Sequence, residues 1–233
     1  MNGNRNLPGT LAYGLNDTNF PVDANNNAQP RTIVFDVGGT IWLGRVGENE
    51  GYDSQDLLSA GSIQKKTSNI TIAGQTAPGG ITIMGGGLKV NGANIVVRNL
   101  TIAPGYGTRS IGADGLPDTY VFDAMNIHAN NVMVDHLSTF FATDETISMD
   151  EVANNVTVQY SNISQGQNYP QADAENGGTF TGHARGSLLQ AGTDAKISVL
   201  HNLCAQQKGR LPRVGSEVGT GAYNDFRNNV FYN

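Results

Sequence analysis

The sequence predicts an all-β protein built as a parallel β-helix, a solenoid of stacked coils. Helical periodicity is nearly absent, and short segments alternate apolar and polar residues and end in Asn or Gly, as strands between tight turns do. The later copies return at irregular intervals of roughly 25 to 40 residues, which is typical of a solenoid whose insertions vary from coil to coil. Among the 233 residues, 30 are glycines, which supply the left-handed backbone that sharp turns need.

Seven segments carry the alternation and are expected to be strands: residues 32–36, 69–72, 81–83, 94–100, 131–137, 155–160 and 196–203. Identical side chains stack above one another in a solenoid, so a column of asparagines can hydrogen-bond along the stack, as amide ladders do in cross-β structures. The candidates for this column are Asn99, Asn162, Asn202 and Asn229. We expect their role to be structural.

The two ends of the chain differ from its middle. Residues 1–31 are rich in Asn and are expected to form an N-terminal lead or a cap over the first coil, with a short helix at 10–15. Residues 32–233 are expected to form a single β-helix domain, truncated at its C-terminal end, because the sequence stops inside a strand-like copy at 231–233. Residues 165–181 lack apolar alternation and are expected to form a long functional loop.

Composition excludes several classes of function. The net charge of −6 and the lack of any Lys/Arg-rich run argue against a nucleic-acid partner. No stretch approaches the ~20 continuous apolar residues of a membrane span, and the polar N-terminus is not a signal segment, so we expect a soluble chain. A single cysteine, Cys204, rules out an internal disulfide and a CxxC metal site, and is expected to be a buried core residue.

Several segments then match, in order, a known family. They resemble the pectate lyase family (polysaccharide lyase family 1) from about Pro8 to Asn233, in residues 31–41, 70–80, 134–136, 142–145, 155–160, and 201–203 followed by 210–214. No single motif is decisive, but the ordered set is specific. The resemblance implies a right-handed parallel β-helix that cleaves polygalacturonate by β-elimination, usually with calcium, outside the cell.

The resemblance also implies the metal site. The family's calcium carboxylates match Asp123 and Asp144, while a further ligand, an aspartate in the family, falls on Ser148. Glu145, Asp150 or Glu151 could take its place, or substrate carboxylate could complete the site, and of these Glu145 is the candidate we carry forward. Taken singly, such aspartates more often cap turns or pair with arginines. Taken together on neighbouring coils, they favour calcium, which binds hard oxygen ligands in flexible geometry.

The catalytic base of the family is the first arginine of an Arg-x-Pro run, which matches Arg210. The family's substrate-binding lysine falls on Arg185, and a second substrate arginine would fall on Gly215, which leaves Arg213 as the nearest cation. His183, in the loop before Arg185, is expected to be exposed enough to touch substrate. Arginine is almost always protonated at neutral pH, so an arginine base implies an alkaline rate optimum. β-Elimination also requires stabilisation of the negative charge on the developing enolate and departure of the C4 oxygen.

Two pairs of adjacent polar residues, Asp135–His136 and Asp144–Glu145, could suggest catalytic pairs, but strand geometry argues against this. Adjacent residues of a strand point to opposite faces, so Asp135 and His136 are not expected to form a catalytic dyad, and His136 is expected to be an inward or stacking side chain. The same argument disfavours a hydrolase that would hold water between Asp144 and Glu145.

Three alternatives to a calcium-dependent pectate lyase remain open. A pectin lyase-like enzyme would act on methylated chains without metal, a hydrolase of the same architecture would need paired carboxylates, and a non-catalytic β-helix module would only bind glycans. The expected partner is polygalacturonate or pectin, with no nucleic acid and no membrane. We expect a monomer, with weak end-to-end association through exposed coil ends.

Overall fold

A computed structural model describes residues 7–24, 29–43, 68–105, 107–111, 117–120, 123–167, 172–173, 179–180, 184–215 and 221–233. Its helices are α1 (Leu11–Leu15) and the 3-10 helices η1 (Asp17–Asn19) and η2 (Gly74–Thr76). Its strands are β1 (Arg31–Ile33), β2 (Gly39–Trp42), β3 (Ile70–Ala73), β4 (Ile81–Met84), β5 (Leu88–Arg98), β6 (Thr101–Ala103), β7 (Gly107–Ile111), β8 (Pro117–Tyr120), β9 (Met125–Asp135), β10 (Ser138–Thr139), β11 (Glu145–Met149), β12 (Asn154–Gln159), β13 (Asn162–Ser164), β14 (Ala172–Asp173), β15 (Thr179–Phe180), β16 (Arg185–Leu189), β17 (Lys196–Leu200), β18 (Leu203–Ala205), β19 (Arg213–Val214), β20 (Tyr223–Arg227) and β21 (Val230–Tyr232).

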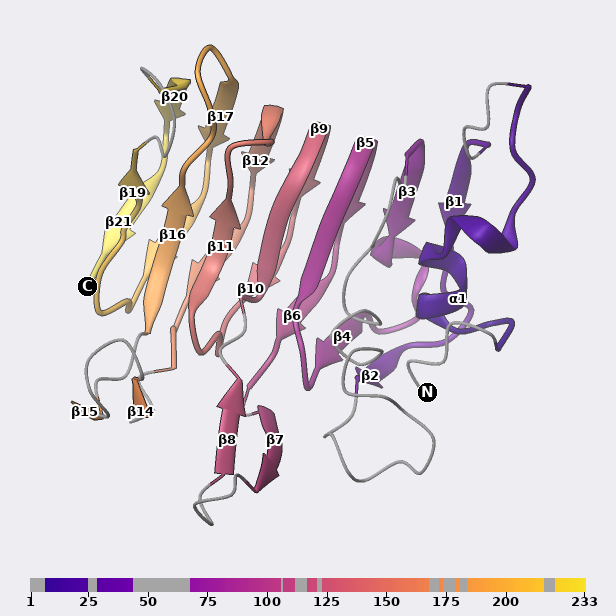
Figure 1. Ribbon diagram of the computed structural model, residues 1–233, viewed down its shortest axis with the longest axis horizontal. Coiled ribbons are helices and arrows are strands. Elements are labelled where there is room, and N and C mark those ends of the chain that lie inside the picture. The colour runs from indigo at the N-terminus through magenta and orange to yellow at the C-terminus, as the bar shows by residue number, and fades with distance from the viewer. Residues whose placement is uncertain are drawn as a thin grey trace.

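The strands form two large parallel sheets. A ten-stranded sheet has the order β1-β3-β5-β9-β11-β16-β19, with β12, β17 and β20 joined through β9, and a seven-stranded sheet has the order β2-β4-β6-β10-β13-β18-β21. Chain order is kept along both sheets, so the coils stack side by side from the N-terminal to the C-terminal end (Figure 1). The predicted parallel β-helix is confirmed.

Two rows of strands make up the larger sheet. The first part of β9 pairs with β11, which continues to β16 and β19, while the second part of β9 pairs with β12, which continues to β17 and β20. The long strands β5 and β9 run through both rows without a break. The later coils therefore contribute to the first row, to the second row and to the seven-stranded sheet, whereas β1 and β3 stand in the second row only.

An asparagine ladder lies at the corner between the two rows. Asn69, Asn94, Asn131 and Asn155 have φ of 60°, 59°, 56° and 51°, a left-handed conformation that asparagine tolerates better than most residues. The side-chain amides of Asn94, Asn131 and Asn155 each donate to the side-chain oxygen of the asparagine one coil earlier, at distances of 2.8, 3.0 and 2.7 Å. An asparagine column therefore exists, at a corner other than the predicted one.

Only half of the predicted asparagine column forms. Asn229 Oδ1 accepts hydrogen bonds from the backbone and the side-chain amide of Asn202, at 2.9 and 3.1 Å. Asn99 is instead a left-handed corner residue with φ of 55°, and Asn162 lies inside β13 opposite Ser138. Asn99 and Asn162 each lie one residue away from the coil position that Asn202 occupies. The column is defined by position in the coil and not by proximity to the end of a strand.

The core lies between the sheets and is built one residue per coil. Ile72, Val97, Val134, Val158 and Val199 stand opposite one another on successive second-row strands, and each is at most 5% exposed. β-Branched side chains suit this pleated, close-packed surface. The alternation seen in the sequence therefore corresponds to side chains that face the core.

The first helix was expected at residues 10–15, and α1 confirms it. The Thr10 hydroxyl accepts a hydrogen bond from the Tyr13 backbone at 3.1 Å and caps the helix, and Leu11 and Leu15 are buried in the core cluster. Cys204 is buried, as predicted, and burial raises the pKa of its thiol to about 11. The division of the chain between residues 31 and 32 stays a prediction.

In the described part of the chain, two antiparallel strand pairs lie outside the stack, and neither was predicted. One pairs β7 with β8, and the other pairs β14 with β15 inside the segment expected to be an irregular loop. Both project from the side of the stack along which β9, β11 and β16 begin (Figure 1). Within the described ranges, no helix has the length and apolar character needed to cross a membrane.

Candidate active site

Charged residues stand at the beginnings of four neighbouring first-row strands. Asp123 comes two residues before β9, Asp144 and Glu145 stand at the start of β11, Arg185 is the first residue of β16, and Arg210 comes three residues before β19. Neighbouring parallel strands lie about 4.8 Å apart, so these side chains are brought together. The acidic residues at the starts of β9 and β11 therefore lie next to the arginines at the starts of β16 and β19.

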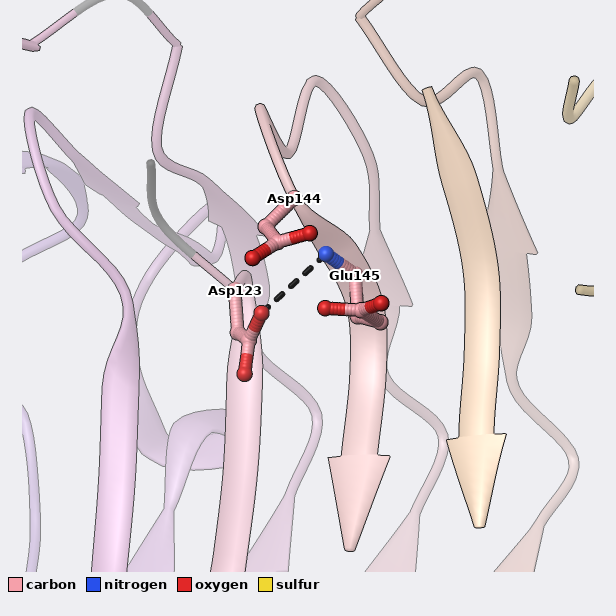
Figure 2. A group of neighbouring side chains, drawn as sticks. All are labelled: Asp123, Asp144 and Glu145. Atoms are coloured by element: carbon pink, nitrogen blue, oxygen red, sulfur yellow. Dashed lines mark hydrogen bonds between the residues drawn. The ribbon is translucent and has the colours of Figure 1, made fainter. Parts of the chain in front are cut away.

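The three carboxylates form one group, here called the acidic cluster: Asp123, Asp144 and Glu145. One oxygen from each lies within 4.8 Å of the others, and Figure 2 shows the carboxylates gathered at two neighbouring strand ends. Asp123 Oδ1 accepts a hydrogen bond from the Glu145 backbone N–H at 3.1 Å. The expectation that Asp144 and Glu145 face opposite sides is wrong, because Asp144 lies in the bend before β11 and not within the strand.

The acidic cluster has the donors and the electrostatics that a calcium ion requires. Burial raises the pKa of Asp123 to about 6; the Ser148 hydrogen bond opposes the rise, the charge of Asp144 adds to it, and Asn126 and Lys89 oppose it. Burial thus disfavours the charged form of the Asp123 carboxyl. A cation bound beside it would favour the charged form and offset the cost of desolvation. Carboxylate oxygens are also the ligands that calcium prefers, so these residues fit the ion.

The basic half of the site is tied to the acidic half. Arg210 forms an ion pair with Glu145, whose side chain is only 5% exposed. Arg185 Nη1 lies 3.6 Å from Asp144 Oδ1 and 3.9 Å from Glu145 Oε1. Glu145, predicted as a metal ligand, therefore already has an arginine as its partner, whereas the Arg185 contacts are longer and looser.

The turn that carries Arg210 packs closely against β16. Arg210 has a left-handed backbone with φ of 59°, and its carbonyl accepts a hydrogen bond from the Ser187 backbone at 2.6 Å. A Cβ at Gly186 would lie 2.4 Å from that carbonyl oxygen, so only glycine permits this approach. The sequence Arg-Gly-Ser at the start of β16 thus sets the height of Arg210 above the sheet.

Arg210 also has an altered protonation equilibrium. Partial burial lowers the pKa of its guanidinium; the charge of Asp144 opposes this, Arg213 lowers the pKa further, and Asp123 opposes it, with a net lowering. Arg213 itself is the exposed first residue of β19. His183, the remaining predicted substrate residue, lies outside the described residues.

Two polar residues beneath the acidic cluster were not recognised as functional from sequence. The Ser148 hydroxyl donates to Asp123 Oδ2, and Asn126 lies directly opposite Ser148 on β9. Ser148 had been identified only as a missing ligand. The signal for Asn126 was available, because Met125 and Ile127 on either side of it are core residues, and alternation puts Asn126 on the outer face with Ser148.

Asp135 and His136 lie elsewhere, at the far end of β9, and outside the acidic cluster. Contrary to expectation, the two side chains meet, with Asp135 Oδ1 and His136 Nδ1 2.8 Å apart, because the left-handed φ of 54° at His136 ends the alternation. The ring of His136 stacks on Tyr160 with centroids 5.2 Å apart. The predicted stacking role of His136 is confirmed.

Comparison with known proteins places the chain among relatives. Proteins named probable pectate lyase C from Neosartorya fischeri and Aspergillus fumigatus are 35% and 34% identical to it over 89% and 99% of this chain. The predicted resemblance to the pectate lyase family is confirmed. The chain spans 39% and 44% of the length of these two relatives.

Other comparisons are more distant. No family model matches the chain. Among solved structures, the crystal structure of pectate lyase Bsp165PelA from Bacillus sp. N165 in complex with trigalacturonate is 17% identical, with a TM-score of 0.45, over 90% of this chain and 76% of that one.

Proposed function

We propose that this chain carries the catalytic domain of a secreted pectate lyase, which cleaves α-1,4-linked polygalacturonate by calcium-assisted β-elimination and releases 4,5-unsaturated oligogalacturonides. One observation carries the proposal: in a chain similar to pectate lyases, two acidic strand ends and two basic strand ends meet at neighbouring positions of one sheet. An acidic polymer with a carboxylate on every sugar suits such a site, provided that positive charge outweighs negative charge where it binds.

The acidic cluster would provide that positive charge by binding calcium. Asp123 and Asp144 would hold the ion, and Glu145 would chiefly hold Arg210, with which it is already paired. A calcium ion bound here would stabilise the negative charge that develops on the uronate carboxylate during proton removal. Arg185, beside Asp144 on the next strand, would bind the same carboxylate or its neighbour.

Arg210 would remove the proton from C5 of the uronide. The proton passes to a guanidine nitrogen, the electron pair of the C5–H bond forms the C4–C5 double bond, and the glycosidic C4–O bond breaks with its electrons on the leaving oxygen. This step requires a neutral guanidine; burial and Arg213 lower the pKa of Arg210 and favour that form, whereas the paired Glu145 carboxylate favours the charged form. Activity should therefore rise toward alkaline pH.

Arg213 and His183 would extend the contact with the polymer. Arg213 is exposed at the start of β19 and stands opposite Leu188, so an oligogalacturonide lying across the first-row strands would meet its guanidinium. Arginine forms bidentate hydrogen bonds with carboxylates, which would fix the register of the chain of sugars. His183 precedes Arg185 by two residues.

The proposal is tested by following the ultraviolet absorbance of the unsaturated product. Polygalacturonate and highly methylated pectin are supplied in parallel at alkaline pH, with calcium or with chelator. We expect product from polygalacturonate that depends on calcium. Product from methylated pectin that is untouched by chelator would favour the metal-free pectin lyase alternative, and binding of oligogalacturonide without any product would favour the glycan-binding module.

A further inference from the structure

The carboxylate of Asp123 is held by donors on both of its oxygens. Oδ1 accepts from the Glu145 backbone N–H at 3.1 Å. Oδ2 accepts from the Ser148 hydroxyl, and the Asn126 amide nitrogen lies 3.5 Å from the same oxygen. These contacts fix the torsion of the Asp123 side chain, which a free aspartate would sample broadly. A carboxylate offers about four lone-pair sites, so Oδ1 keeps one site open.

Asn126 acts on Asp123 mainly through Ser148, because its contact with the serine is much shorter than its 3.5 Å contact with Asp123 Oδ2. Asn126 Nδ2 donates to Ser148 Oγ at 2.7 Å, and Ser148 is only 5% exposed. Since the lone pair of Oγ on that side is used by Asn126, the hydroxyl hydrogen is left to point at Asp123. Asn126 thus orients the Ser148 hydroxyl toward the Asp123 carboxylate.

The amide of Asn126 carries a cost that this role would explain. Its Oδ1 is buried, and among the described residues no hydrogen-bond partner reaches it. A buried acceptor without a partner is destabilising by about 1 to 3 kcal/mol, so stability alone does not account for asparagine at this position. The neighbours Met125 and Ile127 anchor the strand in the core and keep Asn126 on the outer face.

We propose that Ser148 and Asn126 form a hydrogen-bonded support that holds the Asp123 carboxylate in the orientation for binding a divalent cation. This inference rests on the proposed calcium site, and it assigns to Ser148 a positioning role in place of direct ligation. Ser148 and Asn126 stand directly opposite each other on β11 and β9, the same two strands that carry Asp144 and Asp123. The support therefore ties the two halves of the metal site together. Outer hydrogen-bond partners of ligands commonly matter 10- to 100-fold in metal affinity.

Calorimetric titration of calcium into the metal-free protein tests the support. We expect Ser148→Ala to weaken calcium binding about 10-fold and Asn126→Ala to weaken it as well. Because Asn126 acts mainly through Ser148, the double variant should bind only slightly more weakly than Ser148→Ala alone, well short of the sum of the two single losses. Ser148→Thr keeps the hydroxyl and should restore most of the affinity. Ser164→Ala, which removes an equally buried hydroxyl on β13 at 6% exposure, is the matched control and should bind as wild type does.

Several outcomes would overturn the inference. Equal affinity for Ser148→Ala and Ser164→Ala would remove the role of the hydroxyl, and additive losses in the double variant would show independent residues. If melting temperatures show that Ser148→Ala is unfolded, Asn126→Ala decides alone, and unchanged affinity contradicts the support. A wild-type protein that binds no calcium would overturn the proposed metal site itself, and the support with it, whereas the failures above leave that site intact.

Discussion

Arg210 pairs with Glu145 across two strand ends, and the glutamate carboxylate is nearly excluded from solvent. An arginine proposed as a base is thus anchored by an acid that keeps its guanidinium in place between substrate encounters. The same contact separates Glu145 from the two aspartates in role, although all three carboxylates stand in one cluster.

Replacing Glu145 with Gln should destabilise the protein without abolishing calcium binding. Breaking a buried ion pair from one side leaves the other charge uncompensated, which costs about 3 kcal/mol. Urea unfolding measures this loss, with Glu151→Gln, an exposed acid nearby, as the control. A variant that is as stable as the control, or that no longer binds calcium in a titration, would show that Glu145 is a metal ligand in place of an anchor.

The asparagine ladder predicts different effects for two asparagines. Asn131→Ala removes a donor to Asn94 and an acceptor for Asn155 and puts alanine at a positive φ, so it should lose about 2 kcal/mol. Asn131→Gly removes only the hydrogen bonds and should lose about half as much. Asn162→Ala should be nearly neutral, because Asn162 Oδ1 is buried without a partner among the described residues. Equal losses in thermal or urea unfolding for Asn131→Ala and Asn162→Ala would contradict the observed ladder.

The stability contributed by Asp135 should disappear in acid. Burial raises the pKa of this carboxyl, but hydrogen bonds from Gln159 and His136 and the charges of His136 and Arg98 outweigh it, so the pKa falls below the ordinary 3.8. A lowered pKa contributes stability above the unfolded value, which is lost as pH falls through the folded value. Asp135→Asn should therefore be less stable than wild type by about 2 kcal/mol at pH 7. The difference should shrink below the ordinary pKa of 3.8, and a difference that is constant with pH in urea unfolding would refute this account.

Gly186→Ala should displace Arg210 and reduce lyase activity, while the stack stays folded. The new methyl group would stand 2.4 Å from the Arg210 carbonyl, so the turn must move away from β16. A displacement of about 1 Å at a catalytic group can reduce the rate about 100-fold. Circular dichroism establishes folding, and Gly209→Ala, where a Cβ meets no atom within 4 Å, serves as the control. Unchanged activity would mean that the position of Arg210 is not critical.

Alternation and spacing were enough to predict the β-helix, because a solenoid repeats the same local physics in every coil. Second-row strands such as 196–200 were recovered, since Ile197 and Val199 mark the core face. First-row strand β11 is absent from the seven predicted strand segments, because polar side chains of the site interrupt its apolar pattern, although Asp144 and Glu145 at its start were taken to lie in a strand. The ladder was misplaced because sequence does not reveal which asparagine occupies which corner.

The site residues themselves came from resemblance, and their geometry came only from the fold. Sequence placed Asp144 and Glu145 on opposite faces by assuming a strand that in fact begins one residue later. The pairing of Glu145 with Arg210 joins residues far apart in the chain, which no local pattern reports. Ser148 was visible as a departure from the family, but its hydrogen bond to Asp123 needed β9 and β11 to be adjacent.

The proposed role of Arg210 is tested most directly by the rate of unsaturated product formation from polygalacturonate across alkaline pH. Arg210→Ala is compared with Arg98→Ala, an arginine that pairs with Asp135 on the second row, away from the acidic cluster. We expect Arg210→Ala to lose at least about 100-fold in rate with calcium affinity retained, while Arg98→Ala stays near wild type. Activity that survives in Arg210→Ala, with the same pH dependence, would contradict a role for Arg210 as the base.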